Sequence, residues 1–163
     1  MKDDSLELFP LDLTNARPDD IQVATAQLKS LLHEGGNLPV LSSIEVLRQA
    51  EVLHLRVGAD WNELVRESEN GNITERLRQL ATGCLQVTNQ RIVFESRTKK
   101  GSIELKDVVD LSRLADHLFI ELLGPHDPCF TVEPAAALEI TELVIGSLLE
   151  RIRRNKKARF VGR

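Results

Sequence analysis

The densest group of side chains that could bind a metal ion lies in one short predicted turn. His126, Asp127 and Cys129 stand close together in the segment Gly-Pro-His-Asp-Pro-Cys, and imidazole, carboxylate and thiolate groups are ligands that zinc accepts. His117 or Asp116 could complete the set if the chain brought one of them across the turn. The two prolines favour a simpler interpretation, a tight loop that enters a strand.

No motif of a known catalytic type accompanies this turn. The sequence contains no Gly-rich phosphate-binding loop, no His-Glu-x-x-His and no Cys-x-x-Cys pair. Cys84 falls within strand periodicity, which is typical of a small packing residue rather than a nucleophile. We therefore expect no enzymatic activity, no catalytic or metal-binding residues and no cofactor. A metal-dependent enzyme built on His126, Asp127 and Cys129 is our third hypothesis.

Basic side chains form the second group of interest, because they could bind an anionic surface. Residues 150–163 carry seven Lys and Arg against one Glu, a net charge of +6, whereas residues 1–20 carry six acids against two basic residues, a net charge of −4. Such asymmetry is typical of a tail that meets an anionic partner, or of two ends that attract each other. The candidate binding residues lie in one predicted turn and in the tail: Arg97, Lys99, Lys100, Arg151, Arg154, Lys156, Lys157 and Arg159.

A structural interpretation of the same residues stays open. Each basic side chain near an anionic surface contributes about 1 kcal/mol at most, and this contribution falls as salt rises. Cations at the end of a helix also complement its dipole, and a charged hairpin tip discourages edge pairing. Aromatic residues make up only 4% of the chain and Tyr is absent, which disfavours a base-stacking platform for nucleic acid.

Length and composition predict one globular domain. The 163 residues suffice for a single core, and 42% hydrophobic with 28% charged residues is ordinary for a soluble protein. No apolar run approaches the roughly 20 residues that cross a bilayer, and the acidic start lacks the regions of a secretory signal. We expect a cytoplasmic protein without a transmembrane segment, which could also lie at the periphery of a membrane.

The first part of the chain has helical periodicity. Apolar residues recur with helical spacing after Pro18 and the run ends at a pair of glycines, which predicts a helix up to about Leu32. A capping box and a hydrophobic staple around Ser42 predict a second, short helix over Ser43 to Ala50.

The pattern then changes to the two-residue period of strands. Leu53, Leu55 and Val57 alternate with polar residues, as on a strand with one buried face. Residues 61–81 fit both a helical stripe and extended chain, and their place between strands gives a slight preference for strand. Two hairpins follow, with turns at Thr-Asn-Gln-Arg and Thr-Lys-Lys-Gly. Further strands are predicted at residues 108–111, 118–122 and 130–132.

A long amphipathic helix, starting at about position 134, closes the chain. Apolar residues spaced by three and four positions form one stripe that includes Val144 and Leu148, while Glu142, Gly146 and Arg153 fall on the opposite side. Such a helix must pack on an apolar surface, and the face or open end of the preceding sheet is the nearest one. We expect Val144 and Leu148 to be buried and Glu142 to be exposed.

The order of these elements, together with one stretch of sequence, resembles GRAM and bacterial pleckstrin-homology-like (PH-like) domains. The matching pattern from Gly83 to Leu111 is a Gly, an apolar strand, Thr-Asn-x-Arg, an apolar strand that ends in Phe94, and an Ile-x-Leu-x-Asp-Val segment. The resemblance covers roughly residues 50–154. It implies an α+β fold, in which a PH-like antiparallel β-barrel is capped by a C-terminal amphipathic helix and N-terminal helices are added.

The resemblance also implies a binding fold, whose members hold phosphoinositides, other anionic lipids or peptides. It divides the chain into an N-terminal helical extension at 1–49, a PH-like domain at 50–154 and a basic tail at 155–163. Our first hypothesis is a non-enzymatic adaptor or assembly subunit that binds a protein partner, or itself, through a barrel edge and the N-terminal helices. The alternative is a peripheral membrane adaptor whose basic residues bind anionic lipid headgroups.

Overall fold

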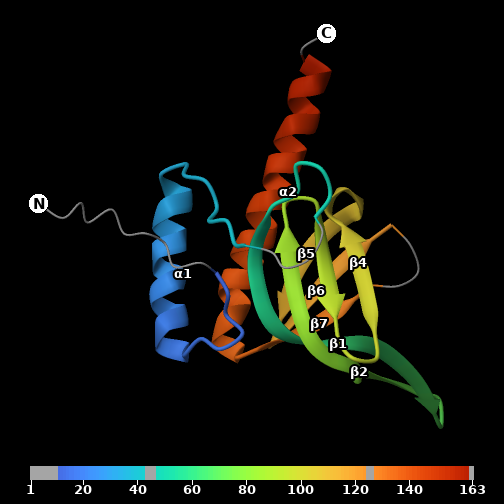
Figure 1. Ribbon diagram of the computed structural model, residues 1–163. Coiled ribbons are helices and arrows are strands. Elements are labelled where there is room, and N and C mark those ends of the chain that lie inside the picture. The colour runs from blue at the N-terminus through green and yellow to red at the C-terminus, as the bar shows by residue number, and fades with distance from the viewer. Residues whose placement is uncertain (1–10, 43–46, 124–126, 162–163) are drawn as a thin grey trace, which may run out of the picture.

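The computed structural model describes residues 11–42, 47–123 and 127–161, with side chains described up to residue 158. Seven antiparallel strands form one curled, barrel-like sheet in the order β4-β3-β2-β1-β7-β6-β5, and two helices lie beside it (Figure 1). The expected α+β class with a C-terminal helix is confirmed. The strands are β1 (Leu53–Glu69), β2 (Asn72–Thr88), β3 (Arg91–Glu95), β4 (Lys100–Glu104), β5 (Val108–Leu114), β6 (His117–Leu122) and β7 (Cys129–Glu133). The helices are α1 (Pro18–His33) and α2 (Leu138–Val161), with short 3₁₀ turns η1 (Leu105–Asp107) and η2 (Ala135–Ala137).

The core lies between the curled sheet and α2. Alternate residues of β1, which include Leu55 and Val57, are buried on one face, as the two-residue period predicted. Val144 and Leu148 of α2 belong to the same apolar core, so their predicted burial is confirmed. Glu142 differs from the prediction, because its side chain is only 40% exposed and lies beside Arg113.

Residues 11–38 contribute to this core as well. Leu11 and Leu13 are buried, and the backbone of Arg56 bonds both of them, donating to the Leu11 carbonyl at 2.9 Å and accepting from the Leu13 amide at 2.7 Å. The predicted helix after Pro18 is confirmed as α1, which lies beside α2 (Figure 1). The apolar stripe of α1 is therefore used within the chain. None of the helices in the described ranges is long and apolar enough to cross a membrane.

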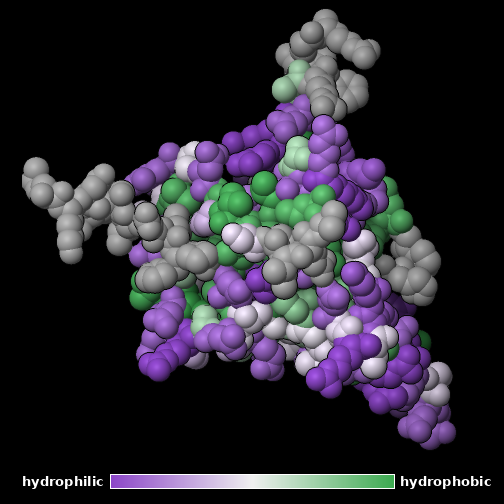
Figure 2. Space-filling view, in the orientation of Figure 1, coloured by the Kyte–Doolittle hydropathy of each residue, from purple (hydrophilic) through white to green (hydrophobic). Residues whose placement is uncertain are grey.

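Residues 61–81 form strands, which confirms the slight preference for extended chain. β7 pairs with β1 only as far as Asn62, and β3 pairs with β2 only from Cys84 onward, so β1 and β2 run on as one long projecting hairpin (Figure 1). Asn70 and Gly71 at its tip both have left-handed φ, as an Asn-Gly hairpin turn requires. Figure 2 shows this projection as mostly hydrophilic. Cross-strand ion pairs stabilise it in place of a core: Arg66–Glu75, Arg76–Glu67 and Arg78–Glu63.

The short helix predicted over Ser43 to Ala50 is wrong for the part that the structure describes. Residues 43–46 lie outside the described ranges, and from residue 47 the chain is a non-helical turn in which Ala50 has φ 60°. Asn89 holds this turn: its Nδ2 donates to the Ala50 carbonyl at 3.0 Å, and its Oδ1 accepts from the Val52 amide at 2.9 Å. A tertiary contact thus overrides the local helix signal.

Candidate interaction surface

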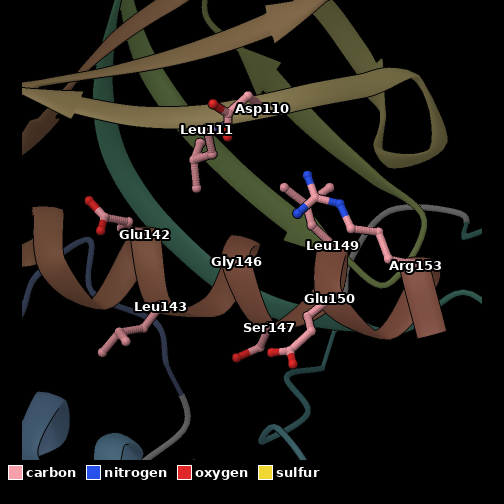
Figure 3. A pocket seen from close by; sticks show the side chains of 9 residues that line it. All are labelled: Asp110, Leu111, Glu142, Leu143, Gly146, Ser147, Leu149, Glu150 and Arg153. Carbon is pink, nitrogen blue, oxygen red and sulfur yellow. The ribbon is translucent and has the colours of Figure 1, made fainter.

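A groove of about 380 Å³ lies between the edge strand β5 and the C-terminal helix α2. Figure 3 shows Leu111 projecting from β5 toward the helix, above Gly146. Glu142 points up toward β5 at one end of the groove, and Arg153 does so at the other. The lining residues are Asp110, Leu111, Glu142, Leu143, Gly146, Ser147, Leu149, Glu150 and Arg153.

Gly146 keeps the middle of this groove open. A Cβ atom built at this position would meet no heavy atom within 4 Å. The apolar side chains of Leu111 and Leu149 border the same space, together with the Asp110 carboxylate (Figure 3). The helix thus presents bare backbone where any other residue would place a side chain.

The free edge of β5 is partly held by side chains of the chain itself. Since the sheet order ends at β5, one edge of this strand has no neighbouring strand in the described ranges. The Asp110 carboxylate accepts the Leu111 backbone N–H at 2.8 Å, and Nη2 of Arg153 donates to the Val109 carbonyl at 3.1 Å. These two side chains therefore occupy backbone groups of β5 beside the groove.

At one end of the groove, a carboxylate oxygen of Glu142 accepts no hydrogen bond from the described residues. Its Oε2 atom is buried and has no hydrogen-bond partner among the described residues. Nε of Arg113 lies 3.5 Å from this oxygen, which gives an ion pair without an aligned hydrogen bond. A buried carboxylate oxygen in this state favours an additional donor.

The predicted basic residues of the tail lie on a helical extension of α2. Arg151, Arg154, Lys156 and Lys157 are all exposed, and α2 carries them away from the body of the protein (Figure 1). Nη2 of Arg154 lies 2.6 Å from Glu150 one turn earlier. Within the described ranges, the other three make no ion pair at all. The Arg159 side chain lies outside the described atoms.

The basic residues of the β3–β4 turn stand apart from this extension. Nζ of Lys99 lies 4.3 Å from the centroid of the Trp61 ring, a cation–π contact, and Nζ of Lys100 lies 3.9 Å from Glu95. Arg97 is exposed at the tip. Figure 1 places this turn at the end of the sheet opposite the projecting end of α2. The structure therefore does not unite the two predicted groups of cations in one site.

Two of the residues in the hypothetical metal site have structural roles in the fold. Asp127 accepts the Leu122 amide at 3.2 Å, and Cys129 is fully buried in β7, where burial raises the pKa of its thiol to about 11. His126 lies outside the described residues, and His117 bonds Thr131 instead, with Nδ1 to Oγ1 at 2.9 Å. In the part of the chain that is described, no three His, Cys, Asp or Glu side chains are grouped to hold a metal ion.

The groove itself was not predicted from the sequence. Helical periodicity assigned Glu142, Gly146 and Arg153 to the solvent side of the last helix. The one sequence signal was Gly146, a glycine inside a strongly patterned helix, where it lowers helix stability without an evident local reason.

The fold defines an α+β protein in which a curled seven-stranded antiparallel sheet packs against a C-terminal helix. No family model matches the sequence, and no curated protein matches it. Among solved structures, the chain is similar to the C-terminal domain of an unknown protein from Leishmania infantum. The TM-score is 0.43 at 13% identity, covering 78% of this chain and 97% of that one.

Proposed function

We propose that this chain is a non-enzymatic interaction module of the PH-like type, which binds an extended segment of a protein partner in the groove between β5 and α2. The strand order, in which three C-terminal strands join the N-terminal four through a β1–β7 pair, supports the PH-like assignment, as does the helix that follows β7. The groove supports the binding role, since an edge strand beside an open groove suits the addition of a partner strand.

Gly146 is the observation that carries this proposal. A glycine inside a helix destabilises it by about 0.5–1 kcal/mol relative to alanine, and a close approach of another part of the chain commonly explains the glycine. Here no atom comes within 4 Å of the vacant Cβ position, so packing inside the described chain does not offset that loss. What the glycine preserves is the open groove.

Substitution at Gly146 tests the proposal directly. Gly146→Leu should fill the groove and abolish the capture of partner proteins from an extract of the producing cells, with quantification by mass spectrometry. Gly146→Ala adds one methyl group to the same site and should retain capture while it raises the midpoint of thermal unfolding. Identical capture by the wild type and the folded Gly146→Leu variant would sink the proposal.

A second candidate function rests on the helical extension of α2. Its exposed cations, Arg151, Lys156 and Lys157, are without ion-pair partners among the described residues, and each would gain about 1 kcal/mol near an anionic membrane surface. Sedimentation with vesicles that contain increasing phosphatidylserine tests this role. Replacement of the three residues by Gln should abolish binding, while Arg97→Gln with Lys100→Gln serves as the matched control at the far end of the sheet. Absence of any dependence on acidic lipid would exclude the membrane role.

A further inference from the structure

We infer that the groove between β5 and α2 selects a partner segment of defined charge order: a basic residue for the Glu142 end and an acidic residue about five positions later for the Arg153 end. This inference rests on the proposed function, and it names the chemistry of the partner that the groove would accept.

At its Glu142 end, the groove offers an unsatisfied acceptor to a hydrogen-bond donor of the partner. The Oε2 atom of Glu142 is buried without a hydrogen-bond partner in the described ranges, and Nε of Arg113, 3.5 Å away, gives it an ion pair but no aligned hydrogen bond. The second carboxylate in the groove, Asp110, lies on β5 above Gly146 and accepts the Leu111 N–H (Figure 3). A Lys or Arg side chain of the partner would donate to the unsatisfied oxygen of Glu142.

At its Arg153 end, the groove offers guanidinium N–H groups to a hydrogen-bond acceptor of the partner. The guanidinium of Arg153 uses one nitrogen on the Val109 carbonyl, which leaves further N–H groups free for a carboxylate in the paired geometry that arginine favours. Glu150 of the same groove is engaged by Arg154. A carboxylate of the partner would therefore bind the free N–H groups of Arg153 beside its contact with the Val109 carbonyl.

The helix sets the spacing between these two ends. Glu142 and Arg153 are eleven residues apart on α2, which corresponds to about 16 Å at 1.5 Å per residue. An extended segment advances about 3.3 Å per residue, so about five residues span the same distance. Val109, near the start of β5, contacts Arg153, and Arg113, near its end, contacts Glu142. β5 therefore runs from the Arg153 end of the groove toward the Glu142 end. A segment that adds antiparallel to β5 therefore places its basic residue before its acidic one.

Four fluorescein-labelled nine-residue peptides provide the probe. They share a Val-Thr-Val-Thr centre at positions three to six, and carry Lys or Glu at positions two and seven in all four combinations. Fluorescence anisotropy should give a Kd at least tenfold lower for the Lys-then-Glu peptide than for the Glu-then-Lys peptide. The double reversal Glu142→Lys with Arg153→Glu should invert this preference, whereas Glu67→Arg with Arg76→Glu reverses an ion pair on the projecting hairpin and should leave the preference unchanged.

Two further variants separate this inference from the proposed function. Glu142→Gln with Arg153→Gln should equalise the four peptides without inversion, and it keeps the test decisive if the double reversal does not fold. If all four peptides bind the wild type equally and Gly146→Leu abolishes that binding, the groove is a binding site and the charge order is wrong. If no peptide binds, or if Gly146→Leu has no effect on binding, both the inference and the groove as a site are overturned.

Discussion

Glu51 and Arg91 form a doubly bonded ion pair beneath the β2–β3 turn. Nε of Arg91 lies 2.9 Å from Oε2 of Glu51, and Nη2 lies 3.2 Å from Oε1. The Glu51 side chain is fully buried, and the Thr88 hydroxyl donates to it at 2.7 Å. The pair joins the segment before β1 to the turn. The Thr-Asn-x-Arg pattern, on which the family resemblance was based, therefore has a structural role in this chain.

Arg91→Ala should destabilise the protein by about 3–5 kcal/mol, because it leaves a buried carboxylate without its counter-ion. Urea unfolding followed by circular dichroism measures this loss. Adding Glu51→Ala to the variant should recover part of the stability, since the unpaired charge is then removed. Arg97→Ala at the exposed turn is the matched control and should stay within about 0.5 kcal/mol. A loss below 1 kcal/mol for Arg91→Ala would show that the pair is dispensable.

Acid should destabilise the fold through Glu51. Burial by itself would raise the pKa of this carboxyl, but hydrogen bonds from Arg91, the Arg48 amide and Thr88 lower the pKa below its ordinary value of 4.5. A carboxyl with a depressed pKa in the folded state stabilises the fold above its ordinary pKa and loses this contribution as the pH falls through the folded value. The free energy of unfolding, measured in urea from pH 6 to pH 3, should decline. Glu51→Gln should reduce the decline, and an unchanged slope in that variant would refute the assignment to Glu51.

His54 should add a separate dependence on pH nearer neutrality. Burial lowers the pKa of this imidazole below 6.5, and the charge of Arg151 lowers it further, although the hydrogen bond to the Pro39 carbonyl acts in the opposite direction. The unfolded chain therefore takes up a proton below pH 6.5 that the folded chain excludes. The free energy of unfolding should decrease as the pH is lowered through this window. Thermal unfolding between pH 7.5 and 5 measures the effect. His54→Asn should flatten the curve, and His33→Asn, a change at an exposed site, should not.

Leu148→Ala should cost about 2–5 kcal/mol, because Leu148 is buried between α2 and the sheet and its removal leaves a cavity. Glu142→Ala should change the stability by less than about 1 kcal/mol, since its ion pair with Arg113 is partly exposed to water. Chemical unfolding of both variants under one set of conditions provides the comparison. Equal losses at the two positions would mean that α2 packs on the sheet differently from the arrangement described.

Truncation after Asn155 should leave the midpoint of thermal unfolding within a few degrees of the wild-type value. Ile152 is the last residue of α2 in the described part of the chain that packs against the core, and Lys156 and Lys157 are exposed. The same truncation should weaken the sedimentation with acidic vesicles described above. Unfolding of the truncated protein at room temperature would mean that the extension is structural.

Periodicity alone predicted most of the elements, and the reason is local. The strand through Leu55 and Val57 and the helix through Val144 each bury one face, and the spacing of apolar residues within a single element records which face that is. The predicted helix at Ser43 to Ala50 shows where this reasoning stops. The hydrogen bonds of Asn89 to Ala50 and Val52 join residues almost forty positions apart, and no local pattern contains them.

The sequence by itself determined the class of the fold, the position of its terminal helix and the basic character of its tail, because these depend on each segment's own residues. Only the tertiary structure decided that the tail and the β3–β4 turn lie at opposite ends of the sheet. It also decided that β5 covers the side of α2 that carries Glu142, Gly146 and Arg153. Periodicity identifies the apolar side of a helix, but which element packs over its polar side depends on contacts between residues far apart in the chain.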